Sequence, residues 1–167
     1  MGLCLKNNDY KKEWFYEGNI SKYFVEYLKK NGHLILKDNS KNIKARGIDI
    51  ISCKENILYL IEVKGYPSDY YAYGTKKGEK KRTHPNSQVK HWFAEVLLST
   101  IINFSKNFNI NEIECKYTKI KLLIVLPKFE KYIELVNFVK NYLDKCCDKC
   151  EKIEFYFIKK NKTIKKL

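Results

Sequence analysis

Two carboxylates and one amine stand in the chain where they could act on one substrate: Asp49, Glu62 and Lys64. Glu62 and Lys64 end the apolar run "LYLIEVKGY" two positions apart, so a strand presents both side chains on one face. If the strands that carry these residues, 47–53 and 57–64, pair through a two-residue turn, the two carboxylates lie opposite one another. The sequence therefore predicts an acidic pair beside a lysine at one end of a hairpin.

Opposed carboxylates repel each other unless a cation lies between them. A hard divalent ion such as Mg²⁺, or Mn²⁺ in its place, takes carboxylate oxygens and keeps several waters. The pattern therefore favours a metal site at Asp49 and Glu62. The alternative is that both acids are ordinary polar residues at strand ends, because a slip of one residue in the register would place them on opposite faces.

A third carboxylate favours the metal site. Glu17 lies three residues before Ile20 and seven before Phe24, so we expect it on the apolar face of the first helix. A lone acid in that position is costly unless it is paired or bound to a cation. Glu26 is the rival acid in this helix, but it lies among lysines on the solvated face and is better explained as a surface ion pair.

The hydrophobic pattern predicts the elements that must position these residues, in the order α-β-β-β-loop-α-β-α-β. The expected helices are 14–30, 86–104 and 129–146, the expected strands are 33–37, 47–53, 56–64, 118–127 and 152–160, and the loop is 65–85. The central strand is apolar on both faces, which is typical of a sheet covered by helices on each side. We therefore expect a single domain over 1–167, a three-layer α/β/α sandwich with a central mixed β-sheet.

The segment "GID" (47–49) followed by "IEVKG" (61–65) resembles the PD-(D/E)xK nuclease superfamily, which has the restriction-endonuclease-like fold. The resemblance covers the core from about Glu17 to Leu98, and Ile48 stands where the motif has proline. It implies a restriction-endonuclease-like core here. The element order above is the order of that core.

The resemblance also implies roles for individual residues. Asp49 and Glu62 would ligate Mg²⁺, with help from the carbonyl of Val63. Lys64 would position or activate the attacking water, and Glu17 would take the place of the first-helix acid that reaches the metal through water.

The second helix carries a further signal. The stretch "QVKHW" resembles the Gln-x-x-x-aromatic pattern of some branches of the superfamily, with Trp92 as the aromatic residue. Gln88 would then bind a metal-bound water or a phosphate near the helix N-terminus. A capping role for Gln88 and core packing for Trp92 are the alternatives, and Asn86 or Ser87 is expected to cap the helix.

The charge balance points to a polyanionic partner. Lys and Arg number 33 against 19 Asp and Glu, which gives a net charge of +14. A lysine-rich composition from an AT-rich genome would produce the same balance without any ligand. Five cations of the loop lie beside the expected metal site and are candidates for phosphate binding: Lys76, Lys77, Lys80, Lys81 and Arg82.

Four tyrosines of the same loop could stack on unpaired bases, or could simply be surface residues: Tyr66, Tyr70, Tyr71 and Tyr73.

The function that these features favour is a metal-dependent endonuclease that hydrolyses phosphodiester bonds of DNA. One alternative is a catalytically inactive nucleic-acid-binding module of the same fold, and another is a structural subunit of a larger complex. The opposed acids favour the enzyme, because a pure binder has no use for carboxylates that repel phosphate. A homodimer, which double-strand cutting often needs, is left open by the sequence.

We expect a cytoplasmic protein, since no run approaches the ~20 apolar residues of a membrane span and no signal-peptide pattern is present. Disulfides are not expected in that compartment. Cys146, Cys147 and Cys150 cluster near the end of the third helix. They are best interpreted as free thiols, with half of a zinc site as the alternative.

Overall fold

The computed structural model describes residues 10–39, 47–71, 74–105, 116–146 and 153–167. Its helices are α1 (Glu17–Lys30), α2 (Pro85–Ser105) and α3 (Glu130–Cys146), preceded by a 3₁₀ turn at Tyr10–Lys12. Its strands are β1 (Leu34–Asp38), β2 (Ile50–Lys54), β3 (Ile57–Val63), β4 (Lys119–Pro127), β5 (Ile153–Ile158) and β6 (Ile164–Lys166). The predicted order of elements is confirmed, and β6 is an addition to it.

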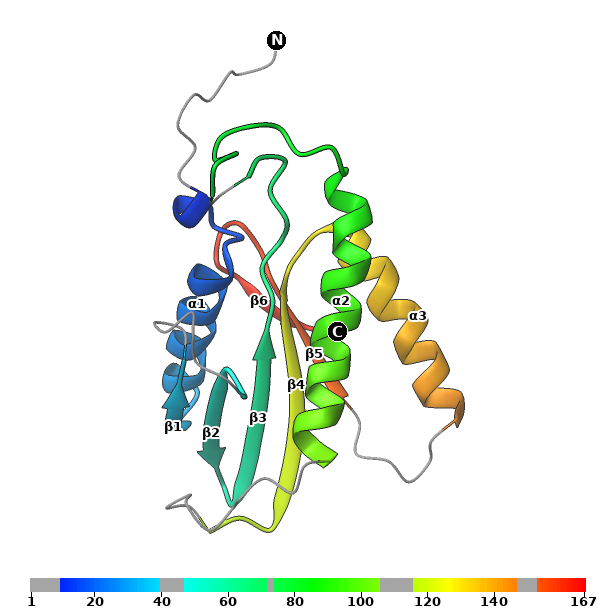
Figure 1. Ribbon diagram of the computed structural model, residues 1–167. Coiled ribbons are helices and arrows are strands. Elements are labelled where there is room, and N and C mark those ends of the chain that lie inside the picture. The colour runs from blue at the N-terminus through cyan, green and yellow to red at the C-terminus, as the bar shows by residue number, and fades with distance from the viewer. Residues whose placement is uncertain (1–9, 40–46, 72–73, 106–115, 147–152) are drawn as a thin grey trace.

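One six-stranded mixed sheet, ordered β1-β2-β3-β4-β5-β6, forms the middle layer (Figure 1). The pairs β3–β4 and β4–β5 are parallel and the other three are antiparallel. α2 connects β3 to β4 and α3 connects β4 to β5, as parallel neighbours require a crossover.

The helices cover both faces of this sheet. Val125 packs in the cluster that contains the buried face of α1, whereas its neighbours Ile124 and Leu126 pack with residues of α2 and α3. Because side chains alternate along a strand, α1 and the α2–α3 pair lie on opposite faces. The fold is therefore the predicted three-layer α/β/α sandwich.

The β2–β3 hairpin has the predicted register. Glu55 and Asn56 form its two-residue turn, with φ angles of 50° and 60°, in the left-handed region that such turns use. Lys54 pairs with Ile57 and Ile50 pairs with Ile61. One further step outward sets the residue before β2 opposite Glu62, so the register argument for the two carboxylates is confirmed.

The C-terminal segment and the 65–85 loop both contain backbone pairing beyond the predicted elements. The basic segment after β5 forms β6, which pairs with β5 with Ile158 opposite Ile164, while Lys165 and Lys166 stay exposed. The 65–85 loop contains local structure where it is described, since Tyr70 bridges Lys80 and the amide of Tyr71 donates to the carbonyl of Glu79.

The cysteines give one contrary result. Cys53 in β2 is disulfide-bonded, although no disulfides were expected, and its partner lies outside the described residues. The side chains of the Cys146–Cys147–Cys150 cluster also lie outside the described part, so that prediction stays untested. Among the residues with described positions, no helix combines the length and apolarity that a bilayer crossing requires.

Candidate active site

The site forms where β3 ends and the chain passes over the start of α1. The amide of Tyr66 donates to the carbonyl of Phe15 at 3.0 Å, and the hydroxyl of Tyr132 donates to the carbonyl of Gly65 at 2.7 Å. A Cβ on Gly65 would lie 2.7 Å from the backbone nitrogen of Glu17. Glycine is therefore required here, because its lack of a side chain lets the end of β3 touch the start of α1.

Replacing Gly65 with alanine is expected to destabilise the protein by about 1–3 kcal/mol, because backbone atoms of α1 must move to admit the methyl group. Urea unfolding of the variant would measure the change. The matched control is Gly32→Asn at the end of α1: a Cβ there meets nothing within 4 Å, and asparagine tolerates its φ of +78°. A Gly65→Ala variant as stable as this control would contradict the close approach.

Asp49 and Glu62 form a carboxyl pair on the sheet face that α2 covers. Oδ2 of Asp49 accepts a hydrogen bond from the amide of Val63 at 2.8 Å. Glu62 is only 8% exposed, and its Oε1 accepts from Nδ2 of Asn103 at 2.7 Å. The two carboxyl groups also share a hydrogen bond. Two acidic side chains, one from the residue before β2 and one from β3, thus meet where they are largely shielded from solvent.

Burial and mutual repulsion raise the pKa values of this pair. Burial, followed by the negative charge of Asp49, raises the pKa of Glu62 to about 8. Burial also raises the pKa of Asp49, and the hydrogen bond from Val63 limits that rise. Without a cation, the pair therefore keeps a proton near neutral pH.

Lys64 lies on the same side of β3, among two acids and an aromatic ring. Its Nζ is 3.1 Å from Oε2 of Glu95, 3.7 Å from Oε2 of Glu17 and 5.7 Å from the ring centre of Trp92. Burial lowers the pKa of Lys64, but the carboxylates of Glu17 and Glu95 more than offset that, so the pKa is raised overall. The ammonium is therefore charged at neutral pH.

Four of the predicted catalytic residues come together. Asp49 and Lys64 interact electrostatically with each other and with both Glu17 and Glu62, and burial raises the pKa of Glu17 although Lys64 opposes the rise. Glu17 is the first residue of α1, with a side chain that is 46% exposed. Its rival Glu26 is exposed to solvent, as expected. The acid–acid–acid–lysine grouping is thus present in the structure.

Gln88 lies in the first turn of α2 and joins the 65–85 loop to the helix. Its Oε1 accepts from Nζ of Lys81 at 3.1 Å, and its Nε2 donates to the carbonyl of Thr83 at 3.0 Å. The helix is capped by His84, whose Nδ1 accepts from the amide of Asn86 at 3.2 Å. The expectation that Asn86 or Ser87 caps α2 is therefore wrong, because the helix starts earlier, at Pro85.

The five loop cations divide into two groups. Lys81 is half-buried through its bond to Gln88. The other four are exposed: Lys76, Lys77, Lys80 and Arg82. All four are free to meet a solvent-borne polyanion, and their role in binding one stays a prediction.

Sequence reasoning missed Glu95 and Asn103. Both lie on the stripe of α2 that begins with Gln88 and Trp92, at helical spacings of three, four and eight residues. α2 is largely apolar, and Glu95 is its single acidic residue. That combination was the available signal, since an acid on an otherwise apolar helix calls for a partner.

The carboxyl pair is a small donor set for a divalent ion. Within residues 10–39, 47–71, 74–105, 116–146 and 153–167, no group of three or more His, Cys, Asp or Glu side chains is arranged to hold a metal. Mg²⁺ needs only one or two carboxylates, with waters completing its octahedron. Asp49 and Glu62 supply two hard anionic oxygen donors that otherwise compete for a proton. The pair therefore fits such an ion.

Comparison with known proteins adds a family. No family model matches the chain. It is 33% identical over 88 residues to a UPF0102 protein from Clostridium botulinum (strain Alaska E43 / Type E3), which covers 53% of this chain and 70% of that relative. The chain belongs to the UPF0102 family. The reaction of this UPF0102 protein must be inferred from its side chains, since the family name states none.

Proposed function

We propose that this UPF0102 protein is a metal-dependent nuclease of the PD-(D/E)xK superfamily that hydrolyses phosphodiester bonds of DNA. The observation that carries the proposal is the buried Asp49–Glu62 carboxyl pair beside Lys64. Such a pair weakens the fold unless it serves a ligand, because repulsion and burial both act against its charged form. A phosphate-binding surface without chemistry would gain nothing from it.

Asp49 and Glu62 would hold Mg²⁺ or Mn²⁺, with the carbonyl of Val63 as a third protein donor. Val63 is suited to this because its own amide already bonds to Asp49, which fixes the backbone at that point. A bound divalent ion supplies an acidified water and a positive charge against the scissile phosphate. Glu17 lies 3.7 Å from Nζ of Lys64 and would orient water at the edge of the site.

Lys64 acts as a fixed positive charge. Its raised pKa keeps the amine protonated at neutral pH, so it stabilises negative charge that develops on the phosphoryl oxygens. Glu95 and Glu17 hold Nζ between them and thereby limit its conformations. Gln88 and the exposed loop cations would position the substrate through its phosphates.

A cleavage assay tests the proposal. Plasmid, branched and single-stranded DNA are incubated with Mg²⁺, Mn²⁺ or EDTA, and Asp49→Asn is run beside the parent protein. We expect cleavage that requires the metal and falls at least about 100-fold in the variant, because one of two ligands is lost.

Two results would contradict the proposed nuclease function. Equal cleavage by parent and variant would assign the activity to a contaminant. Salt-dependent DNA binding by both, with no cleavage under any condition, would favour the inactive nucleic-acid-binding module.

A further inference from the structure

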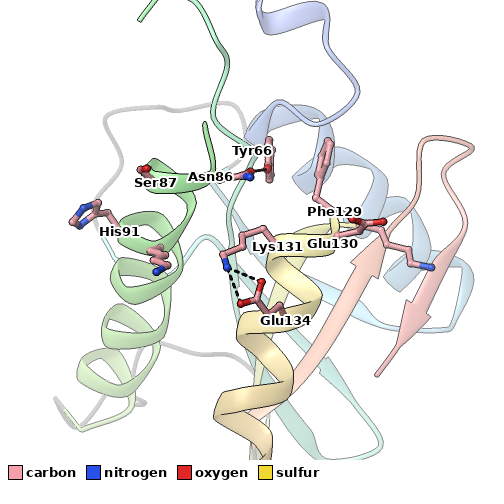
Figure 2. A pocket seen from close by; sticks show the side chains of 10 residues that line it. Tyr66, Asn86, Ser87, His91, Phe129, Glu130, Lys131 and Glu134 are labelled. Carbon is pink, nitrogen blue, oxygen red and sulfur yellow. Dashed lines mark hydrogen bonds and ion pairs between the residues drawn. The ribbon is translucent and has the colours of Figure 1, made fainter. Parts of the chain in front are cut away.

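A large cavity is lined by residues of α2, of α3 and of the segments just before α3 and just after Lys64. It measures about 1050 Å³ and lies between the first turns of α2 and α3, as Figure 2 shows. Tyr66 and Phe129 form one wall, and Asn86, Ser87 and His91 come from α2. Tyr66 follows Lys64 by two residues, so the cavity wall includes the chain just beyond the candidate active site.

The wall rings are stacked in a column. Tyr66 and Phe129 are 3.8 Å apart at their centres with planes 21° apart, and Trp14 stacks on Phe129 at 5.4 Å and 15°. Phe15 meets both Tyr66 and Phe129 edge-on, at 82°. The column is therefore held on several sides, and its rings Tyr66 and Phe129 line the cavity.

A second cavity of about 260 Å³ shares Tyr66 and Phe129 with the first. Its wall adds the rings of Tyr10, Phe15 and Tyr70, and Tyr70 is 42% exposed. Its charged lining is acidic, from Glu13 and Asp69. Such a cavity repels phosphate, but it suits a nucleobase, because rings stack on its faces and carboxylates accept from its amino groups.

The larger cavity carries an excess of positive charge, in contrast to the acidic lining of the smaller one. Three lysines and two glutamates line it, and Lys131 is paired with Glu134 at 2.6 Å. Lys90 and Lys128 are exposed, and neither forms an ion pair with the described residues. Glu130 is the acid that opposes them. Two exposed ammonium groups therefore face this cavity, beside the aromatic wall.

We infer that the two cavities bind an unpaired strand of the nucleic-acid substrate, an inference that rests on the proposed nuclease function. Bases stack at Tyr70 and in the smaller cavity, and phosphates contact Lys90 and Lys128 in the larger one. An unpaired strand is required because a duplex hides the faces of its bases, and aromatic side chains can stack only on exposed faces. The substrate is therefore single-stranded or carries a single-stranded arm next to the cut.

Binding in EDTA tests this inference apart from cleavage. The probes are a labelled 12-nucleotide single strand, the same sequence as a duplex, and a duplex with a single-stranded arm, followed by fluorescence anisotropy over a salt series. We expect the single strand and the armed duplex to bind at least tenfold tighter than the blunt duplex. Lys90→Glu with Lys128→Glu should lower single-strand affinity about tenfold or more and reduce the salt slope by about two.

The matched charge control is Lys22→Glu with Lys29→Glu, two exposed residues of α1 that line neither cavity. For stacking, Tyr70→Ala should weaken binding of the normal single strand about tenfold, but not that of an abasic strand of equal length. Tyr142→Ala, an exposed tyrosine of α3, is its control.

Equal affinity for single strand and blunt duplex, or cavity variants that behave like their controls, would overturn the inference. Metal-dependent cleavage of blunt duplex alone would support the proposed nuclease function and contradict only the inference that the substrate carries an unpaired strand. Single-strand binding as described, with no cleavage by any preparation, would support the binding of an unpaired strand and contradict the proposed nuclease function.

Discussion

Replacing Lys64 with methionine is expected to lower the cleavage rate about 10²–10³-fold, while Mn²⁺ binding to the folded protein stays unchanged. Methionine keeps most of the length of the side chain and an apolar body beside Trp92, but it removes the charge that faces the phosphate. Glu17 and Glu95 lose their common partner, and both are partly exposed, so water can solvate them. The fold should therefore survive the substitution.

The measurement is single-turnover cleavage beside calorimetric titration with Mn²⁺. Lys29→Met, an exposed lysine of α1, is the control for loss of one positive charge. A Lys64→Met protein that cuts at the parent rate would show that the amine has no part in the reaction. A variant that loses both cutting and Mn²⁺ binding would mean that Lys64 supports the metal site and not the phosphate.

Replacing Glu62 with glutamine is expected to stabilise the metal-free protein above pH 8 while abolishing cleavage. The pKa of Glu62 is raised from 4.5 to about 8, so the folded carboxyl keeps a proton that the unfolded chain releases between these values. The free energy of unfolding therefore falls as pH rises from about 4.5 to about 8. Glutamine carries no charge and removes this fall, which is worth on the order of 2–4 kcal/mol.

Thermal unfolding at pH 5 and pH 8.5, in EDTA, measures the effect. The variant should melt about 5–10 °C above the parent at pH 8.5 and much closer to it at pH 5. Added Mn²⁺ should stabilise the parent and leave the variant unchanged. Glu26→Gln, on the exposed face of α1, should show neither change. A Glu62→Gln variant that is less stable than the parent at pH 8.5 would mean that Glu62 has a structural role.

The register of the two acids could be predicted because it is decided locally. Residues 55 and 56 form a two-residue turn, and the period of a strand then fixes which side chains oppose one another. Glu17 could be placed for a similar reason, since its distance from Ile20 puts both on one side of α1. Local geometry thus gave most of the site.

The contacts made by α2 could not be predicted in this way. Its position over the sheet depends on how Val89, Phe93 and Val96 pack against β4 and α3, which no local pattern reveals. Glu95 therefore reaches Lys64, and Asn103 reaches Glu62, through tertiary packing. The disulfide of Cys53 was missed for a different reason, because the assumed compartment set the expectation.

The most direct test of the central claim is anomalous diffraction from crystals of the full chain soaked in Mn²⁺ at pH 8. The account predicts one strong anomalous peak coordinated by carboxylate oxygens of Asp49 and Glu62, with the hydrogen bond between the two groups gone. A pair that still shares its proton, with no peak beside it at Mn²⁺ concentrations that support cleavage, would contradict the account.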